Sequence, residues 1–298
     1  MTYNKHIFQF MNRLPLTKRT QILQMLVEGS SMRSISRVVG VSINTVTKLL
    51  VDAGEACEFW HNAKVRDVQA RRIQCDEIWS FCLAKDRNAP AEKKATGDAG
   101  SVWTWTALDP DSKLMISWMV GGRDNETGTD FMRDLAFRLR DRVQLTSDGL
   151  NVYRKAVPAA FGDDVDYGML VKLYSTDPVS KSSPERRYSP PVCIGAHKDR
   201  VIGKPAVHKI STSHVERANL TMRMSMRRFT RLTNAHSKKI ENHCHALALY
   251  FVWYNWVRPH AGLHGKTPTM AAKLADAPMT MADIVKLADL GAVGPKSN

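Results

Sequence analysis

The stretch VQLTSDGLNVY, residues 143–153, begins like a β-strand and then reaches a carboxylate. Its first four residues, VQLT, include apolar and β-branched side chains that suit an extended segment. The SDG that follows is typical of a turn, and an aspartate in such a place most often serves the turn itself. Asp148 becomes a candidate metal ligand only if other carboxylates reach the same end of the sheet.

Strand-like segments on both sides of this stretch predict the rest of a sheet. A helix with an apolar face, residues 125–142, precedes the stretch, and a second helix is expected at about 153–161. The other strand-like segments are RRIQCDEIWSFCLA (71–84), VWTWTALD (102–109), KLMISWMVGG (113–122) and VDYGMLVKLYS (165–175). Three consecutive strands followed by alternating helices and strands predict an α/β fold with a mixed five-stranded sheet flanked by helices.

Residues 17–54 predict a small helical domain in front of the sheet. Three short helix-like segments end at the glycines Gly29, Gly40 and Gly54. Two short helices joined by a glycine turn are typical of a helix-turn-helix, whose second helix lies in the major groove of DNA. That helix carries four candidate DNA contacts, Asn44, Thr45, Thr47 and Lys48. A three-helix packing that does not bind DNA is the alternative.

The chain of 298 residues has a formal net charge of +14, and the excess is uneven. Glu216 is the single acid within residues 201–240, where lysines and arginines are frequent. This imbalance favours nucleic acid as the partner, and a solvated basic surface is the alternative. No apolar run approaches the roughly 18 residues of a membrane-spanning helix, so we expect no membrane partner.

The cysteine pattern and the N-terminus indicate a compartment. The five cysteines are scattered without a C-x-x-C pair, which indicates neither a disulfide framework nor a zinc ribbon. The N-terminal sequence MTYNKHIFQFMNR has no apolar core of a signal peptide. We therefore expect a soluble, cytoplasmic protein with reduced thiols.

Two further carboxylates are candidates to meet Asp148. Asp76 lies in the first predicted strand among apolar residues, where an acid is costly to bury without a partner. Its neighbour Glu77 is expected on the opposite face of the strand, because side chains alternate. The third candidate is Glu216, in the predicted helix of about 212–232.

The helix around Glu216 has a polar face and a separate apolar stripe. At 100° per residue, Glu216, Arg223 and Arg227 fall close to one line, with Asn219 beside them. A surface ion pair between Glu216 and an arginine is the alternative. Three convergent acids suit phosphodiester transfer, which uses two divalent cations held by carboxylates. The sequence thus predicts a site for Mg²⁺ or Mn²⁺, with two ions.

The order of elements and the three acids resemble the RNase H-like DDE fold of transposases and retroviral integrases. The stretches SHVERANLTMRMSMRRFTRLTN and YNWVRPHAGLHGKTPTMAA resemble bacterial insertion-sequence transposases of the insertion-sequence-one type. The resemblance covers residues 71 to about 273. It implies that Asp76, Asp148 and Glu216 are catalytic metal ligands. The chain departs from many such relatives because it lacks an N-terminal cysteine zinc ribbon.

The resemblance also implies partners and an organisation. The partners are double-stranded DNA, as insertion-sequence ends and target, in a bacterial cytoplasm, with a homodimer or higher oligomer on DNA. Candidate DNA contacts in this part are Asn219, Arg223, Arg227 and Arg258. The expected segments are a helix-turn-helix domain (17–54), a linker (55–70), a catalytic domain (71–275) with a basic surface insertion (176–209), and a C-terminal tail (276–298).

Two other functions remain open from the sequence. The HVER sequence also fits the His-x-x-Arg of tyrosine recombinases, with Tyr250 or Tyr254 as the nucleophile. That class has a mainly helical fold and uses no metal, whereas residues 71–175 are rich in predicted strands. A DNA-binding regulator without catalysis is the second alternative, and it would bind DNA without cleaving it in magnesium.

Overall fold

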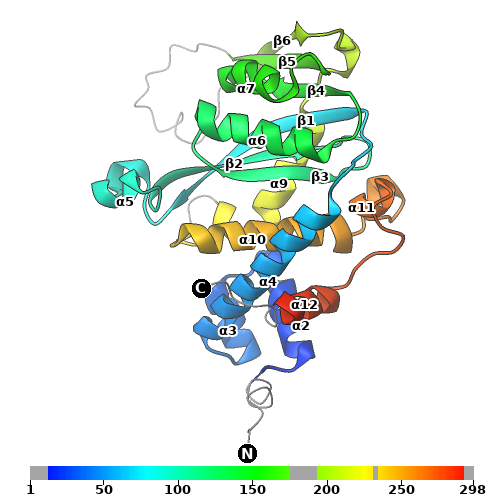
Figure 1. Cartoon of the computed structure of the whole chain (residues 1–298). Coiled ribbons are helices and arrows are strands. Elements are labelled where there is room, and N and C mark those ends of the chain that lie inside the picture. Colours follow the sequence, from blue (N-terminus) through cyan, green and yellow to red (C-terminus); the bar gives the residue numbers. More distant parts are fainter. Residues whose placement is uncertain (1–12, 175–192, 231–233, 292–298) are drawn as a thin grey trace, which may run out of the picture. The chain divides into compact units, whose positions relative to one another are not determined.

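The computed structural model describes residues 13–174, 193–230 and 234–291 and divides into two compact units (Figure 1). The sheet unit comprises residues 65–79 and 102–219. The helical unit comprises the described parts of residues 1–64, 80–101 and 220–298. Each unit has its own buried core and is described by itself.

The sheet unit is built on a six-stranded mixed sheet of order β3-β2-β1-β4-β5-β6. β1 pairs with β4 in parallel and β4 pairs with β5 in parallel, whereas the β2–β3 and β5–β6 pairs are antiparallel. The last residues of β1 and the first of β2 belong to the helical unit. The strands are β1 (Arg72–Cys82), β2 (Gly100–Leu108), β3 (Met115–Gly121), β4 (Val143–Asp148), β5 (Val165–Tyr174) and β6 (Cys193–Ile202).

The five strands expected from the sequence are present, and β6 is a sixth that the sequence did not predict. It lies within residues 176–209, which were expected as a surface insertion; residues 176–192 lie outside the described residues. Its side chains are mostly exposed and do not alternate between apolar and polar. The strand is defined by its backbone pairing with β5, which a search for apolar alternation does not detect.

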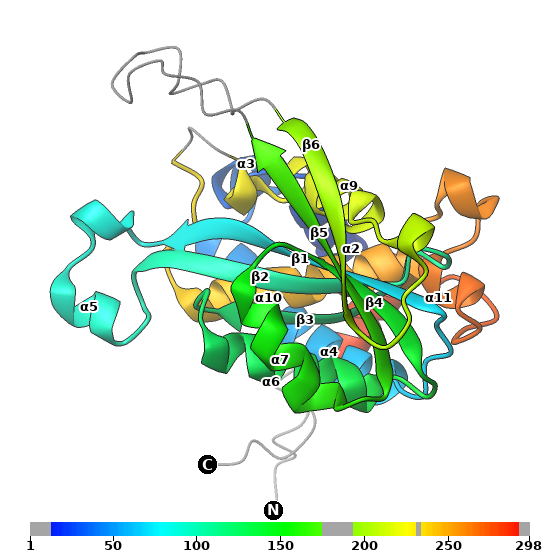
Figure 2. The ribbon, with the colours of Figure 1, turned by 90° about the horizontal axis from the view of Figure 1, so that it is seen from above.

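Helices cover both faces of this sheet. α6 (Asn125–Arg138) and α7 (Asn151–Phe161) lie on one face (Figure 2). On this face the buried Trp105 contacts Phe131 and Tyr153. The first part of α9 (Ser213–Ser225) lies on the other face, because Thr106, the next residue of β2, bonds to Asn219.

The helical unit contains the predicted helix pair. α2 (Leu16–Val27) precedes α3 (Met32–Val39), whose N-terminus is capped by the Ser31 side chain. Gly40 ends α3 with φ 69°, the left-handed conformation that glycine favours, and α4 (Ile43–Lys64) follows. The unit also contains α5 (Ala91–Ala95), α10 (Ile240–Val252), a π-helical turn (Trp253–Val257), α11 (Pro268–Ala271) and α12 (Met281–Gly291).

The segments expected as a linker and as a C-terminal tail both contain helix. The prediction that Gly54 ends its helix is wrong, because α4 continues through residues 55–64, which were expected as a linker. A Cβ at Gly54 would lie 2.4 Å from the Cβ of His245 in α10, so the glycine permits close packing of two helices. Within residues 276–298, expected as a tail, α12 buries Met281, Ile284 and Val285. No helix in the described ranges is both long and apolar enough to cross a membrane.

Candidate carboxylate site

Asp76 and Asp148 lie at the same level of two adjacent parallel strands. In the β1–β4 register Gln74 lies opposite Thr146, and each aspartate comes two residues further along its strand. Side chains two residues apart share one face of a strand, so Asp76 projects on the same side as Gln74. Gln74 accepts hydrogen bonds from the backbone N–H groups at the start of α9. The register therefore brings Asp76 toward both Asp148 and α9.

Asn219 of α9 holds the Asp76 carboxylate. Its Nδ2 donates to Asp76 Oδ2 at 2.9 Å, and the side chain is 4% exposed. The Thr106 hydroxyl lies 3.0 Å from the Asp76 backbone carbonyl and 3.3 Å from Asn219 Oδ1, and these two acceptors share its single proton. Asn219 was predicted to contact DNA, which stays a prediction; in this structure its amide faces an acid.

The charge environment of Asp76 is unfavourable for an ionised carboxylate. The pKa of Asp76 is raised from its ordinary 3.8 to about 6, mainly by burial and to a smaller extent by the negative charges of Asp148 and Glu216, while the hydrogen bond from Asn219 lowers it. Asp148 and Glu216 therefore each lie close enough to Asp76 to repel its negative charge. Such repulsion favours the binding of a cation from solution.

Asp148 has the turn role that its sequence suggested and also a place near the other acids. Its Oδ1 accepts a hydrogen bond from the backbone N–H of Leu150 at 2.9 Å. Its Oδ2 lies 3.9 Å from Nη2 of Arg123, in the loop after β3. One carboxylate oxygen thus stabilises the turn after β4, and the other lies within ion-pair distance of the Arg123 guanidinium.

Glu216 lies in the first turn of α9 and is paired with a lysine. Its Oε1 accepts hydrogen bonds from Lys172 Nζ and from Thr212 Oγ1, both at 2.5 Å. Lys172 lies on β5. The alternative interpretation of Glu216 from the sequence was a surface ion pair with an arginine. Glu216 is therefore in an ion pair, but its partner is a lysine of β5 and not an arginine.

The donor chemistry fits a magnesium site, although the side chains are not arranged as a ready-made one. Three carboxylates and an amide carbonyl supply the oxygen ligands that Mg²⁺ prefers. Within the described residues, no group of three or more His, Cys, Asp or Glu side chains is arranged to hold a metal ion. Glu216 is engaged by Lys172 and Asp148 by the turn, so binding requires side-chain rotation.

Glu77 lies on the opposite face of β1 from Asp76, as the alternation predicts. Its side chain is 1% exposed, and Arg123 donates to its Oε2 from Nη2 at 3.1 Å and from Nε at 3.3 Å. The Arg123 guanidinium also lies 4.6 Å from the centre of the Trp103 ring. Burial, and then Asp148, raise the pKa of Glu77 from 4.5 to about 7, while Arg123 lowers it.

The predicted DNA contacts of the helix-turn-helix lie in the first two turns of α4. The Ser42 hydroxyl accepts from the backbone N–H of Thr45 at 3.1 Å at the start of this helix. Asn44 and Lys48 are exposed, whereas Thr45 and Thr47 are half-buried. Lys48 pairs with Asp52, and its side chain is 75% exposed.

The predicted helical line from Glu216 to Arg227 is wrong. α9 ends at Ser225, because Met226 has an extended backbone (φ −113°, ψ 110°) and Arg227 begins a short 3₁₀ turn. Arg223 remains within α9 and is half-buried. Arg258 stacks on Trp253, with its Cζ 5.3 Å from the ring centre. Contact of these arginines with DNA stays a prediction.

The tyrosines required by a recombinase are buried. Tyr250 is 1% exposed and Tyr254 is 5% exposed, and burial raises the pKa of both phenols above the ordinary value. A nucleophilic tyrosine must reach a phosphodiester and lose its proton, and both properties disfavour that role. The burial of both tyrosines therefore disfavours the tyrosine-recombinase alternative.

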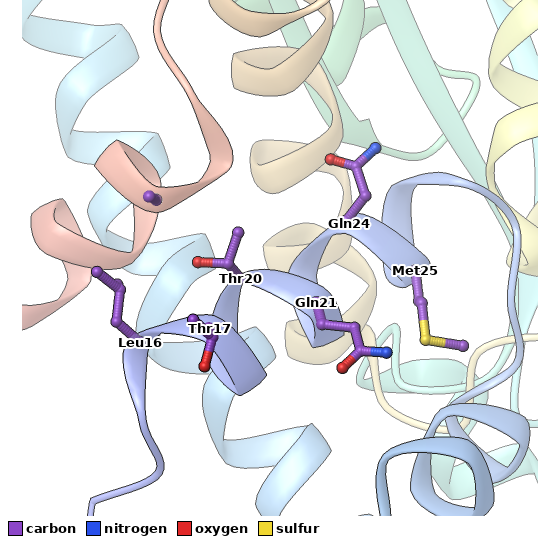
Figure 3. Close-up of a pocket in the computed structure, with 7 residues that line it drawn as sticks. Leu16, Thr17, Thr20, Gln21, Gln24 and Met25 are labelled. Carbon is purple, nitrogen blue, oxygen red and sulfur yellow. The ribbon is translucent and has the colours of Figure 1, made fainter.

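A groove of about 510 Å³ lies along α2 in the helical unit (Figure 3). It is lined by Leu16, Thr17, Thr20, Gln21, Gln24, Met25 and Ala282. These side chains include no acid, histidine or cysteine, so the groove offers no group for acid–base or metal chemistry.

No protein-family model and no curated protein matches the chain. Among solved structures, the chain is similar to a Mos1 transposase paired-end complex with the left transposon end, with 12% identity over 56% of this chain and a TM-score of 0.23. It spans 60% of the length of that transposase chain. It is also similar to the piggyBac transposase synaptic complex with hairpin DNA, with 11% identity and a TM-score of 0.40. That match covers 95% of this chain and 73% of the piggyBac chain.

Proposed function

We propose that this protein is a DDE transposase of a bacterial insertion sequence that cleaves and joins DNA strands in a metal-dependent reaction. The observation that carries the proposal is the placement of Asp76 and Asp148 on adjacent parallel strands, with Glu216 close enough to repel Asp76. In the proposal the sheet unit is an RNase H-like catalytic core. The six strands are compatible with it, since β6 adds to one edge.

Asp76, Asp148 and Glu216 would hold Mg²⁺ or Mn²⁺, as two ions. When bound, such ions activate the attacking oxygen and stabilise the leaving oxygen of a phosphodiester. Asn219 orients the Asp76 carboxylate through its 2.9 Å hydrogen bond, and the Thr106 hydroxyl lies within hydrogen-bond distance of the Asn219 side chain and of the Asp76 backbone carbonyl. The role of these neutral side chains is to hold the acid in one rotamer before DNA and metal arrive.

The helix pair α3–α4 is the proposed reader of the insertion-sequence ends. Gly40 supplies the turn between the helices, and Asn44 and Lys48 are exposed on the second helix. The net charge of +14 supports a polyanionic partner. We place both the ends and the target DNA on a homodimer or higher oligomer in the bacterial cytoplasm.

The experiment that tests the proposal is strand cleavage of labelled DNA that carries the sequences flanking the gene. Purified protein should cleave these ends in Mg²⁺ or Mn²⁺ and not in EDTA. Asp148→Asn should bind the same DNA and melt near the wild-type temperature, yet lose cleavage and joining. Cleavage by Asp148→Asn at the wild-type rate would show that Asp148 is only a turn residue, and the proposal would then fail.

The binding arm of the same experiment tests the helix-turn-helix. Replacing Asn44 and Lys48 together with alanine should weaken binding to the ends and reduce the dependence of log affinity on log salt by about 0.9 per lost phosphate contact. Lys286→Ala is the matched control, because Lys286 also lies on an exposed helix face and pairs with an aspartate there. An unchanged salt slope in the double variant would remove α4 from the interface.

Binding without cleavage in any divalent metal would instead support a non-catalytic regulator. In that case variants of the triad Asp76, Asp148 and Glu216 would bind DNA like the wild type, and none of these proteins would cleave it.

A further inference from the structure

Lys172 introduces a positive charge among the three acids. It lies on β5 two residues after Leu170, which pairs with Asp148 on β4. Side chains two residues apart share a face, and Gly168, two residues before Leu170, packs against Ile210, close to the start of α9. Lys172 therefore projects on the side of the sheet where Glu216 lies, and its ammonium reaches Glu216 Oε1 at 2.5 Å.

The charge of Lys172 acts on more than one acid. It interacts electrostatically with Asp76 as well as with Glu216. The side chains of Lys172 and Glu216 are 31% and 39% exposed, so water reaches both ends of the ion pair. Exposed ion pairs contribute little to stability, and this pair is therefore poorly explained as a device to hold the fold together.

We propose that Lys172 occupies the cation position at Glu216 in the metal-free protein, competes with the divalent metal for this carboxylate, and turns to a DNA phosphate when the metal displaces it. The inference rests on the proposed function, since it gives Lys172 a role at the same acids that are proposed to bind the metal. A lysine is suited to such an exchange, because its ammonium is a compact charge on a flexible stem and binds phosphate without a fixed geometry.

The competition links metal binding to DNA binding. Without DNA, the metal must displace the ammonium from Glu216, and the other acid that it interacts with, Asp76, is itself a proposed metal ligand, which lowers the apparent metal affinity. A DNA phosphate beside β5 would accept the displaced ammonium, so DNA and metal would each favour binding of the other. The Lys172–Glu216 ion pair would keep the affinity of the site for the metal low until DNA binds.

The test is a thermal-shift titration of the purified full chain with MnCl₂, without DNA. Lys172→Gln should lower the half-saturating metal concentration by about three- to tenfold, and Lys172→Arg should leave it near or above the wild-type value. Lys155→Gln is the matched control, because Lys155 is an exposed lysine of the same unit on α7. It should titrate like the wild type.

A second arm measures the link to DNA. The gain in affinity for a labelled duplex on adding Ca²⁺, followed by fluorescence anisotropy, should be about three- to tenfold smaller for Lys172→Gln than for the wild type. If Lys172→Gln does not fold, Lys172→Met and Lys172→Arg are compared with the wild type in both arms.

The outcomes separate this inference from the proposed function. A wild-type metal shift that is lost in Asp148→Asn but has the same midpoint in Lys172→Gln overturns the role of Lys172 and leaves the triad in place. A wild type without any metal shift overturns both. A lower midpoint in Lys172→Gln, with a smaller metal-induced gain in DNA affinity, supports the exchange.

Discussion

Asp76 and Glu77 are adjacent acids on β1 with opposite surroundings. Asp76 lies on the α9 face, where its carboxylate receives an amide hydrogen bond and feels the negative charges of Asp148 and Glu216. Glu77 lies on the α6–α7 face, where Arg123 donates to it twice. Both acids interact with the negative charge of Asp148, but Glu77 has a directly bonded arginine, whereas the side-chain partner of Asp76 is a neutral amide. Under the proposed function, the acid on the α9 face binds the metal and its neighbour on the other face does not.

The largest expected effect is on strand cleavage and separates the two acids. Asp76→Asn should reduce cleavage of labelled ends by about a thousandfold or more, comparable with the upper range for removing one preorganised stabilising group. Its melting temperature should stay near or above that of the wild type, since one of three repelling charges is removed. Cleavage rates and thermal melts are measured on the same preparations.

Glu77→Gln is the matched control for this prediction. It changes the neighbouring acid to its amide in the same way. The cleavage rate should stay within about tenfold of the wild type, the lower end of the effect of residues that touch a metal ligand but not the metal. If Glu77→Gln abolishes cleavage while Asp76→Asn retains it, the two faces have been assigned in reverse.

The contrast between the faces was only partly predictable from the sequence. An acid among apolar strand residues, and the alternation that sends Glu77 away from Asp76, are local features, and both were confirmed. The partners are not local, because Arg123 lies 46 residues from Glu77 and Lys172 lies 44 residues from Glu216. Lys172 did have a signal, as a charged residue within an apolar strand, whereas Arg123 follows two glycines in a loop and has none.

The second expected effect is on stability and tests the Glu77 face. Arg123→Ala leaves a buried carboxylate without its cation, which typically costs about 3–5 kcal/mol. Arg123 is 38% exposed, so water offsets part of this, and we expect a loss of about 2 kcal/mol at pH 8. Chemical denaturation measures it.

A double-mutant cycle shows whether the loss comes from this pair. Adding Glu77→Gln to Arg123→Ala should restore most of the lost stability, because the unpaired charge is then gone. Additive losses in the double variant would mean that Arg123 acts through Trp103 or Asp148 and not through Glu77.

The third expected effect returns to the Asp76 face. Asn219→Ala removes the amide that orients Asp76, and it should raise the half-saturating metal concentration for cleavage about tenfold, at the lower end of the range for groups that orient a metal ligand. Thr106 still holds the backbone at Asp76, which limits the effect. Recovery of the rate at saturating metal identifies a positioning residue; a rate that stays low at any metal concentration points to misfolding, which a melt checks.

The fold itself was predictable where local patterns decide it. Five strands and the helices α6 and α7 follow from apolar runs and alternation, and all were found. The errors occur where a distant segment decides the local structure. Gly54 has the appearance of a helix end, yet α10 packs against it and the helix continues. β6 lacks an apolar pattern and depends on pairing with β5.

The smallest expected effect is the dependence of stability on pH, compared between the wild type and Glu77→Gln. The pKa of Glu77 is raised in the folded protein from 4.5 to about 7, mainly by burial, so the folded state retains a proton that the unfolded state has lost. The stability from this proton is fully present below about pH 4.5 and is lost as the pH rises through about 7. The melting temperature of the wild type, relative to Glu77→Gln, should therefore fall by a few degrees over this window, since about 1 kcal/mol shifts the melting temperature of a protein of this size by about 2–4 °C.

Asp76 titrates in an overlapping window, from 3.8 to about 6, but it is present in both proteins and its contribution largely cancels in the difference. A difference that rises with pH would mean that Arg123 lowers the pKa of Glu77 more than burial raises it. The two faces of β1 would then both carry ionised acids, and their contrast would rest on hydrogen bonding alone.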